Sequence, residues 1–273
     1  MPHVTWEGDG LARIVCFISD FGLDDTWVGV CHATIARVCP EARVVDLAHG
    51  IAPYDIRAGA IAAAAGVFQL PDAIHMVVVD PGVGGERRAL CLLTLAGGIL
   101  LGPDNGILLP AALRAGGVTS AFELHVGDAA PTFHARDVFS PAAGHLACGV
   151  TPDELGSELD VASLAPGPFG LCERRDDFVF GEVLGPDRFG SLRLNVPSER
   201  LAEYGLSGDR LEVGVGHNTL TVPVGRTFSD VGEGEPVAII DSSGWLTLAV
   251  NKGSAADRYG VTPGTHVRLR VVP

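Results

Sequence analysis

The sequence has few basic residues for its length of 273. It contains 19 Lys and Arg against 33 Asp and Glu, which gives a formal net charge of −14 at pH 7. No basic patch or basic helix interrupts the acidity, and this argues against the phosphate backbone of a nucleic acid as a partner. The acidic surface favours solubility and is compatible with a cationic small ligand.

The sequence shows no recognisable segment for export or for membrane insertion. The first ten residues contain no basic region followed by an apolar one, and no long apolar run lacks a charge or a turn former. The six cysteines (positions 16, 31, 39, 91, 148 and 172) include no Cys-x-x-Cys pair, and most lie in apolar segments. We therefore expect buried free thiols in a cytoplasmic protein without a membrane span.

Several common functional motifs are absent. No Gly-x-Gly-x-x-Gly follows the first expected strand, and no Gly-x4-Gly-Lys-Ser/Thr occurs, which argues against a dinucleotide or P-loop site. Ser19 and Ser140 lack the surroundings of a nucleophile elbow. A metal site could be assembled from Asp20, Asp24, His49 and His134. Because no two of these have ligand spacing on a single helix, we expect no metal.

The first half of the chain alternates between expected strands and helices. Buried strands are expected at 14–18, 43–47 and 76–79, and helices at 27–38 and about 55–68. A hairpin (89–94 and 98–101), a short helix (108–114), a strand (122–126) and a helix (about 138–148) follow. This alternation is typical of a parallel α/β sheet.

The second half contains short strands and little helix. Strands are expected at 178–184, 191–196, 210–215, 219–224, 236–241, 245–250 and 266–271, which indicates a sandwich or barrel. Residues 151–175, rich in Pro, Gly and Ser and without periodicity, separate the two patterns. The sequence thus predicts an N-terminal α/β domain with a mainly parallel sheet (1–160), a linker (161–176) and a C-terminal all-β barrel domain (177–273).

The stretch from Val77 to Arg88 is the most informative one. A run of β-branched residues ends at Asp80, a Pro-Gly-x-Gly-Gly turn follows, and Arg87 can fold back toward Asp80. Open α/β sheets bind ligands at the carboxyl ends of their strands, where Asp80 is expected. Taken alone, the stretch is equally compatible with a tight turn and a surface ion pair.

Two further polar side chains are expected near the same edge of the sheet. Asp20 follows the first strand as Asp80 follows its own, and His134 lies in a turn segment. Asp20 could simply cap the next helix, and a lone histidine after a phenylalanine is more often structural. Their common position after apolar strands or in turns favours a ligand-binding cleft.

Six separated motifs occur in a characteristic order. They are Ser19-Asp20-Phe21-Gly22-x-x-Asp25, Val79-Asp80-Pro81-Gly82-Val83-Gly84, Gly102-Pro103-Asp104-Asn105-Gly106, Phe133-His134-Ala135-Arg136-Asp137, Ser242-Ser243-Gly244-Trp245-Leu246 and Ser254-Ala255-Ala256. Together they resemble the S-adenosylmethionine hydroxide adenosyltransferases, hydrolases related to fluorinases and chlorinases, over about residues 14–271. The resemblance implies the same two-domain fold and a homotrimer with its active site at the subunit interface. It also implies S-adenosylmethionine as the substrate, with no cofactor.

The resemblance also implies roles for individual residues. Asp80, Arg87 and His134 match the set around the reacting water, which Arg87 and His134 would orient while Asp80 accepts a hydrogen bond or proton. The residues matching substrate contacts are Asp20 (ribose), Tyr54 (against the sugar), Asp187 and Ser242 (methionine ammonium), and Ser191, Phe228 and Ala255 (adenine). Phe133 also matches a substrate-binding position. Two positions depart from the family pattern: Ser191 replaces the usual Asn, and Ala135 replaces the usual Gly.

Two alternatives stay open from the sequence. The first is a halogenase on the same fold, but a carboxylate at position 80 would repel a halide. The second is a protein that binds adenosine or S-adenosylmethionine without turnover, against which the presence of Asp80, Arg87 and His134 argues.

Overall fold

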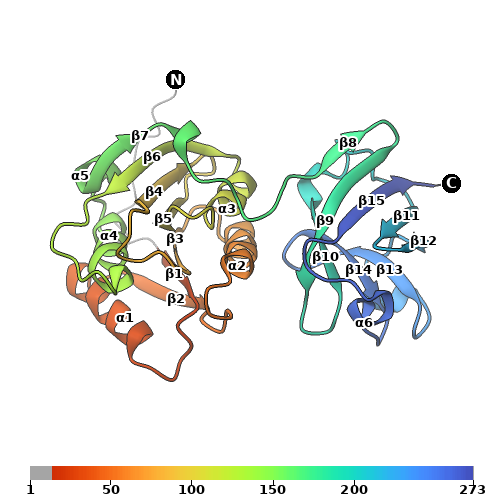
Figure 1. Ribbon diagram of the computed structural model, residues 1–273, viewed down its shortest axis with the longest axis horizontal. Coiled ribbons are helices and arrows are strands. Elements are labelled where there is room, and N and C mark those ends of the chain that lie inside the picture. The colour runs from red at the N-terminus through yellow and green to blue at the C-terminus, as the bar shows by residue number, and fades with distance from the viewer. Residues whose placement is uncertain (1–13, 273) are drawn as a thin grey trace. The chain divides into compact units, whose positions relative to one another are not determined.

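The computed structural model describes residues 14–272. The chain divides into two compact units with the boundary between Pro168 and Phe169, inside the segment predicted as the linker. Figure 1 shows one unit with helices around a sheet and a second unit made almost entirely of strands. Within residues 14–272, no helix has both the length and the apolar character needed to cross a membrane.

The first unit is an α/β fold. Its elements in chain order are β1 (Ile14–Ser19), α1 (Trp27–Val38), β2 (Arg43–Ala48), α2 (Ile56–Gln69), β3 (Ile74–Val78), β4 (Ala89–Thr94), β5 (Ile99–Pro103), α3 (Leu109–Arg114), β6 (Val118–Leu124), the π-helical turn η1 (Ala135–Phe139), α4 (Ser140–Ala147), α5 (Pro152–Leu155), β7 (Gly156–Leu159) and the 3-10 turn η2 (Val161–Ser163).

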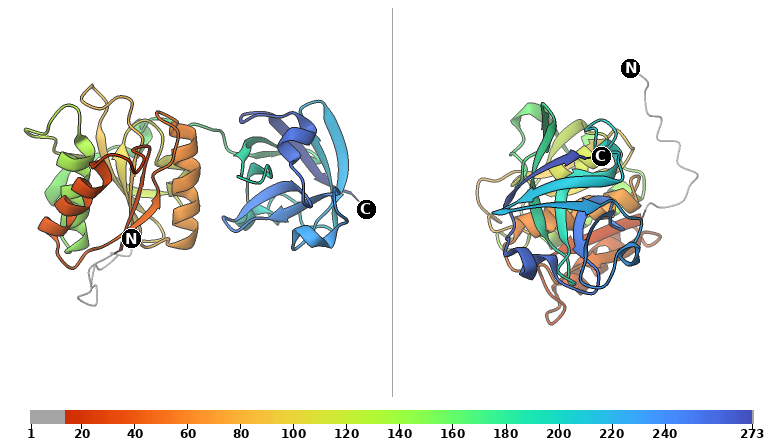
Figure 2. Two further views of the ribbon diagram at one scale, coloured as in Figure 1. Left: turned by 90° about the horizontal axis from the view of Figure 1, so that it is seen from below. Right: turned by 90° about the vertical axis from the view of Figure 1, so that its right-hand side faces the viewer.

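The sheet of the first unit has the order β2-β1-β3-β5-β4-β6-β7. The neighbouring strands β2, β1, β3 and β5 run parallel, while β4, β6 and β7 continue the sheet with antiparallel pairings. Helices α1 and α4 cover one face and α2 covers the other (Figure 2, left). This layering confirms the predicted α/β fold, with its parallel part around β1 and β3.

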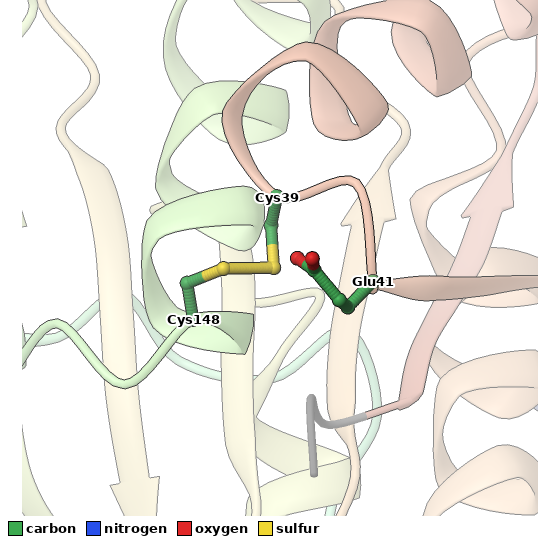
Figure 3. A group of neighbouring side chains, drawn as sticks. All are labelled: Cys39, Glu41 and Cys148. Carbon is green, nitrogen blue, oxygen red and sulfur yellow. A yellow bond between two sulfur atoms is a disulfide. The ribbon is translucent and has the colours of Figure 1, made fainter. Parts of the chain in front are cut away.

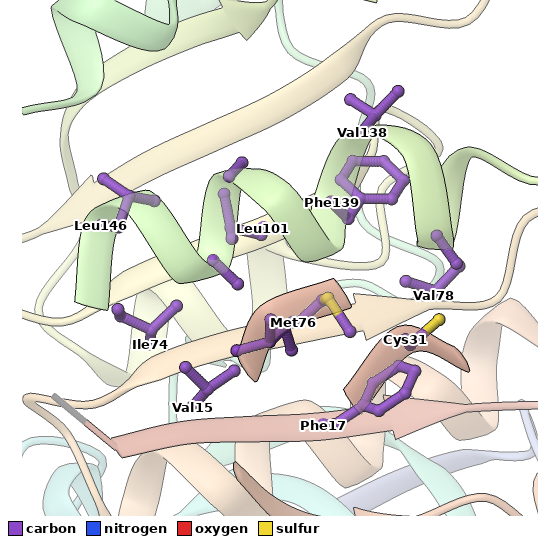
Figure 4. Packing of buried hydrophobic residues seen from close by; sticks show 14 of the residues in the cluster. Val15, Phe17, Cys31, Ile74, Met76, Val78, Leu101, Val138, Phe139 and Leu146 are labelled. Carbon is purple, nitrogen blue, oxygen red and sulfur yellow. The ribbon is translucent and has the colours of Figure 1, made fainter. Parts of the chain in front are cut away.

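The core of this unit follows the alternation of side chains along the two central strands. Val15 and Phe17 of β1 and Met76 of β3 belong to the buried cluster under α1 and α4, to which Phe139 and Leu146 also contribute (Figure 4). The alternate residues of β1 and β3, whose side chains point to the opposite face of the sheet, are also buried, so both faces of the strands are covered. That explains why these strands read as continuous apolar runs in the sequence.

Local sequence sets the bounds of the helices. The Asp55 side chain accepts a hydrogen bond from the Ala58 amide (2.9 Å) and caps α2, which ends just before Leu70 and Pro71. Helix α1 ends at Val38, two residues before Pro40, as predicted. The helix expected at about 138–148 begins earlier, because the π-helical turn η1 starts at Ala135 and runs directly into α4.

The second unit is an antiparallel barrel-like sheet with the strand order β12-β11-β15-β9-β10-β14-β13. A bridge between Val224 and Ala238 joins the end of β12 to β13, so the path nearly closes. The elements are β8 (Glu173–Arg175), β9 (Phe178–Pro186), β10 (Leu192–Pro197), η3 (Ser198–Arg200), β11 (Arg210–Val215), β12 (Asn218–Pro223), η4 (Phe228–Asp230), β13 (Pro236–Ile240), β14 (Trp245–Val250), α6 (Ala255–Tyr259) and β15 (His266–Val271). All seven predicted strands are present, which confirms the barrel.

The segment 151–175 contains more regular structure than its sequence indicated. It contains α5, the edge strand β7 paired with β6, the turn η2 and the short strand β8. Ser157 and Glu158 of β7 are exposed, so a strand at the edge of the sheet leaves no apolar alternation to read. A stretch whose sequence lacks periodicity thus still forms a helix, two strands and a turn.

The prediction of six free thiols is wrong for two of them. Cys39 and Cys148 form a disulfide that joins the C-terminal ends of α1 and α4 (Figure 3). The other four cysteines are free and buried. The two paired residues are 109 positions apart, and only the packing of α1 against α4 brings them together, so their spacing gave no sign of the pair.

Candidate functional site

The two predicted carboxylates lie at the same edge of the sheet. Ser19, the last residue of β1, is in register with Val78, the last residue of β3. Because these neighbouring strands run parallel, Asp20 and the Val79–Asp80 segment leave the sheet side by side at its carboxyl end. The prediction that both follow buried strands is confirmed.

Asp80 and Arg87 form a buried, forked ion pair. Arg87 Nε lies 3.0 Å from both Asp80 Oδ1 and Oδ2, and Arg87 Nη2 also donates to Oδ2. The two side chains are only 5% and 9% exposed, respectively, so the pair is not a surface contact. The guanidinium also lies over the Phe139 ring, 5.7 Å from its centroid. Arg87 is thus held from two directions.

His134 is the third member of the cluster. Its Nδ1 lies 2.9 Å from Arg87 Nη2. A guanidinium only donates hydrogen bonds, so Nδ1 is the acceptor and the proton of the neutral ring is on Nε2. Burial, followed by the positive charge of Arg87, lowers the pKa of His134 below its ordinary value of 6.5. The ring is therefore neutral at pH 7 and presents an Nε2–H donor.

One donor of the cluster has no partner. Arg87 Nη1 is buried and makes no hydrogen bond to the part of the chain that the structure describes. A buried cationic N–H group without an acceptor carries a desolvation cost, so it favours binding of a water, a hydroxide or another acceptor. The cluster of Asp80, Arg87 and His134 therefore combines a free cationic donor with a carboxylate and a neutral imidazole.

Aromatic packing joins the His134 segment to the Asp20 segment. Phe133 meets Phe21 edge to face, with ring centroids 5.9 Å apart. Asp137 accepts a hydrogen bond from the Ala130 amide (3.0 Å) and fixes the turn before His134. Ala135 is 2% exposed and belongs to the buried cluster under α1 and α4.

Asp20 contacts Tyr54, another predicted substrate residue. The Tyr54 amide donates to Asp20 Oδ2 (2.9 Å), and the Tyr54 side chain is 73% exposed. Tyr54 has a positive φ of 69°, which is uncommon for a non-glycine residue and is found preferentially where function requires it. In the first unit, the structure therefore arranges the predicted residues in two connected groups. These are Asp80, Arg87 and His134, and Asp20, Tyr54 and Phe133.

A network behind Asp20, buried at Ser19 and His49 but partly exposed at Asp46 and His32, was not predicted. Ser19 Oγ lies 2.7 Å from His49 Nδ1, and Asp46 Oδ1 lies 2.9 Å from His49 Nε2 and 2.8 Å from His32 Nε2. The residue types are those of a nucleophilic triad, but Ser19 is 0% exposed, so a substrate cannot reach its hydroxyl. The His49 carbonyl accepts from the Gly22 amide (2.8 Å), which ties the loop after Asp20 to this network.

In the second unit, a tight turn holds two predicted substrate residues. Asp187 Oδ1 accepts from the Phe189 and Ser191 amides at 2.8 and 2.9 Å. Gly190 has a φ of +82°, and a Cβ there would lie 2.2 Å from Ser254 Oγ, so only glycine fits. Its carbonyl accepts from the Ala256 amide (2.9 Å), which places the Asp187 turn against the start of α6 beside Ala255.

The remaining two predicted residues lie in other loops of this unit. Phe228 begins η4 between β12 and β13 and is 44% exposed. Ser242 lies in the turn between β13 and β14, where Asp241 Oδ1 accepts from the Ser243 and Trp245 amides. Asp241 also pairs with Arg193, two residues after Ser191 (2.9 Å). The Ser242 turn is thus connected to β10.

Potential metal ligands gather at a different place. Within residues 14–272, the group that meets the spacing of a metal site is Cys39, Glu41 and Cys148 (Figure 3). Its two sulfur atoms are joined in the disulfide, so they are not thiolates and do not bind a metal. His49, one of the residues considered from the sequence, is already bonded to Ser19 and Asp46.

Comparison with family models gives two matches that cover most of the chain. Residues 15–156 match the SAM hydroxide adenosyltransferase N-terminal domain, and residues 181–268 match the SAM hydroxide adenosyltransferase C-terminal domain. Two crystal structures are also similar. An uncharacterized conserved protein from Thermotoga maritima has a TM-score of 0.84 at 30% identity, covering 94% of this chain and 100% of that one. A conserved hypothetical protein from Thermus thermophilus has a TM-score of 0.74 at 41% identity, covering 94% and 99%.

Named relatives are similar over nearly their whole length. The (R)-S-adenosyl-L-methionine hydrolase of Salinispora tropica is 41% identical, covering 93% of this chain and 97% of that protein. The protein of the same name from Thermus thermophilus is 42% identical, covering 94% and 99%. A fluorinase from Nocardia brasiliensis is 28% identical, covering 96% and 98%. The similarity to the hydrolases is therefore greater than to that fluorinase.

Proposed function

Because the chain belongs to the SAM hydroxide adenosyltransferase family, we propose that it hydrolyses S-adenosyl-L-methionine to adenosine and L-methionine. The observation that carries this proposal is the buried cluster of Asp80, Arg87 and His134, in which Arg87 Nη1 has no partner among residues 14–272. The hydrolases from Salinispora tropica and Thermus thermophilus support the same reaction.

The chemistry of the substrate explains what the enzyme must supply. The sulfonium makes methionine a neutral thioether leaving group, so its departure from C5′ needs no general acid. The nucleophile is the difficult part, because water must be held in line with the C5′–S bond while its oxygen gains negative charge. The new C–O bond forms as the C–S bond breaks, and water gives up one proton.

The protonation states and hydrogen bonds of the three side chains indicate the role of each in the reaction. Arg87 Nη1–H and His134 Nε2–H donate to the water oxygen and stabilise its developing charge. The lone pair of His134 is occupied by Arg87, so His134 does not act as the base in this arrangement. Asp80 keeps acceptor capacity beyond the bonds from Arg87, because a carboxylate can accept about four hydrogen bonds. We therefore propose Asp80 as the acceptor of the hydrogen bond or proton that the water gives up.

The substrate contacts follow from the two groups around this cluster and from the second unit. Asp20 accepts the ribose hydroxyls, with the exposed Tyr54 ring and Phe133 beside the sugar. Asp187 and Ser242 hold the methionine ammonium. Ser191, Phe228 and the Ala255 backbone hold adenine. These roles rest on the family motifs. In support of them, the Gly190 carbonyl, next to Ser191, accepts a hydrogen bond from the Ala256 amide, next to Ala255.

The configuration of the substrate is suggested by the names of the relatives. Both hydrolases are named for (R)-S-adenosyl-L-methionine. Because "L" already fixes the amino-acid carbon, "R" describes the sulfonium sulfur. We therefore propose the R form as the substrate. Assays with separated R and S sulfonium epimers should give adenosine mainly from R, and equal rates would contradict this part.

A halogenase activity is the second candidate, since fluorinases are among the relatives. Asp80 argues against it, because a buried carboxylate beside the anion position repels halide. Assays with added chloride and fluoride should show no halogenated nucleoside. Robust 5′-chloro-5′-deoxyadenosine formation would replace the hydrolase proposal.

We further propose a homotrimer whose substrate sites combine the first unit of one subunit with the second unit of a neighbour. The distribution of predicted contacts over both units supports it. Light scattering should give three subunits. Coexpression of inactive Asp80→Asn and Asp187→Asn chains should restore about a quarter of the wild-type activity by random assembly. No restoration would indicate a site within one subunit.

We propose that the reaction needs no cofactor or metal, with S-adenosylmethionine acting as the substrate. We also propose that the protein acts in the cytoplasm. Four buried free thiols support a reducing compartment, whereas the Cys39–Cys148 disulfide argues against one. Unchanged turnover of dialysed protein in the presence of a chelator would support the first point. Fractionation of native cells tests the second.

Labelled water tests the main proposal most directly. Purified protein is incubated with S-adenosylmethionine in ¹⁸O-water, and the products are analysed by mass spectrometry. One ¹⁸O atom in adenosine and none in methionine is the expected result. Label in methionine, or binding of S-adenosylmethionine without any adenosine, would overturn it.

A further inference from the structure

We propose that Asp104 and Asn105 are positioning residues that hold both ends of the turn carrying Asp80 and Arg87. The inference deepens the proposed function and rests on it. Asp80 and Arg87 are joined by a turn with glycines at 82, 84 and 85, a composition that by itself allows many backbone conformations. The forked geometry between them must therefore be supported from outside the turn.

Asn105 fixes the entry to the turn. Its Nδ2 donates to the Val79 carbonyl (2.9 Å), and Val79 directly precedes Asp80. The ladder between β3 and β5 ends at the pair Met76–Leu101, so this side-chain bond continues the link between the strands after their backbone pairing has stopped. Asn105 Oδ1 accepts from the Ile107 amide (3.2 Å), which fixes the orientation of the side-chain amide.

Asp104 fixes the exit from the turn. Its amide donates to the carbonyl of Arg88 (2.9 Å), the residue after Arg87, and Arg88 Nε donates to Asp104 Oδ2 (2.8 Å). The Asp104 side chain is 7% exposed, and its Oδ1 accepts from the Ala165 amide (2.9 Å). Arg88 also donates to the Ser163 hydroxyl and carbonyl, at 2.9 and 2.6 Å. Arg88 is therefore engaged on both sides.

The two neighbouring arginines thus have separate carboxylates. Arg87 pairs with Asp80 and Arg88 pairs with Asp104, so Arg88 does not compete for Asp80. Loss of either anchor lets the turn shift relative to His134, which comes from a distant part of the chain. A displacement of about 1 Å at a reacting group can cost about 100-fold in rate. Asp104 and Asn105 therefore control the direction in which Arg87 presents its Nη1–H.

The test compares isosteric variants with a matched control. Asn105→Asp keeps the size of the side chain and the acceptor for Ile107, but it loses the donor to Val79. Asp104→Asn keeps an acceptor for Ala165 but removes the charge that pairs with Arg88. The control is Thr94→Val, which removes a buried bond to the Gly98 carbonyl (3.1 Å) at the opposite end of the same hairpin.

Two measurements are made on each protein: kcat and KM for adenosine release, and the NMR titration and tautomer of His134. We expect both variants to lose about 10-fold or more in kcat with KM within about 2-fold. The fraction of His134 with its proton on Nε2 should fall, and its pKa should move toward the ordinary value. Thr94→Val should leave kcat and the His134 signals unchanged while lowering the melting temperature.

The outcomes separate this inference from the proposed function. If wild-type protein releases no adenosine, the proposed function fails, and the His134 signals still decide whether Asp104 and Asn105 position Arg87. If both variants keep wild-type kcat and wild-type His134 signals, the inference is wrong even though the enzyme is active. An equal loss of kcat in Thr94→Val would show a general effect of stability and would also overturn it.

Discussion

A guanidinium donates up to five hydrogen bonds and accepts none, and this asymmetry decides what its neighbours can do. Arg87 uses Nε and Nη2 on Asp80 and also directs Nη2 at His134 Nδ1. Lysine in its place could not supply the fork, because an ammonium is a point charge on a flexible stem. The chemistry of the cluster therefore depends on the arginine as much as on its two titratable neighbours.

The first prediction concerns the pH dependence of catalysis. Protonated His134 cannot accept from Arg87 and would place two cations together, so only the neutral ring is active. Because burial and Arg87 lower the pKa of His134 below 6.5 in the free protein, kcat/KM should be constant around neutrality and fall only at a pH below 6.5. A kcat/KM profile taken downward from neutral pH checks this. An acid limb centred at or above 6.5 would contradict it.

The same shift affects stability with a definite sign. The unfolded chain binds a proton at His134 at a higher pH than the folded chain does, so protonation favours unfolding. The contribution of this residue is complete above pH 6.5 and is lost as the pH falls from 6.5 through the lowered pKa. The buried His75, whose pKa is also lowered by burial, contributes with the same sign.

The second prediction separates turnover from binding. Asp80→Ala should lower kcat by about 100-fold or more with nearly unchanged KM, because Asp80 acts on the water rather than on the bound substrate. Asp20→Ala should mainly raise KM, because ribose contacts exist in the ground state and in the transition state. Steady-state kinetics of the two variants give the comparison. Normal turnover of Asp80→Ala would remove Asp80 from the mechanism.

At the scale of the elements, the turn after β3 and the segment before η1 must fit closely. Gly84 has a φ of +74°, and a Cβ at this position would lie 2.2 Å from the Pro131 carbonyl oxygen. Both the conformation and the contact exclude a side chain. Gly84 therefore sets how near the Asp80–Arg87 turn comes to the segment that carries His134.

This close approach gives the third prediction. Gly84→Ala should lower kcat by about 10-fold or more, since the clash moves Pro131 and with it His134 away from Arg87. Stability should also fall, because positive φ is strained for alanine. Gly97→Ala is a matched control: Gly97 has a φ of +87° in the β4–β5 turn, with open space for a Cβ. Similar losses of kcat in both variants would contradict a local effect.

The elements themselves show what the sequence could and could not predict. Strands β1 and β3 and helix α1 were predictable, because buried strands are continuous apolar runs and Pro40 limits the helix. Strand β7 was not, since its pairing with β6 depends on tertiary structure and its side chains are largely exposed. The start of η1 at Ala135 was also missed, because a π-helical turn has no 3.6-residue pattern.

The candidate site was predictable to a similar degree. The proximity of Asp20 and Asp80 follows from two parallel strands ending in register, which periodicity alone suggests. The contact between Arg87 and His134 could not be predicted from periodicity. The two residues are 47 positions apart, and only the family motifs indicated that they meet. The bonds of Asp104 and Asn105 to Arg88 and Val79 are side-chain contacts between loops, which no sequence pattern encodes.

At the scale of the whole molecule, stability and chemistry depend on different parts of the first unit. The cluster lies beyond the carboxyl ends of the parallel strands, whereas the disulfide between Cys39 and Cys148 ties the C-terminal ends of α1 and α4. Helix α4 continues from η1, which begins directly after His134. The helical segment formed by η1 and α4 therefore starts beside the site, and the disulfide anchors its opposite, C-terminal end.

The fourth prediction follows from this cross-link, which joins residues 109 positions apart. A link across so long a segment restricts the unfolded chain, and its loss should lower the free energy of unfolding by about 2–4 kcal/mol. Cys39→Ser/Cys148→Ser should show this loss in urea unfolding, and wild-type protein with a reductant should match it. The reductant should not affect the double variant, because the other four cysteines are free.

Since η1 and α4 stay packed in the buried apolar cluster without the link, kcat of the folded double variant should be close to wild type. Equal stability of oxidised and reduced wild-type protein would show that the cross-link does not contribute, and a large loss of kcat would show that it also positions His134.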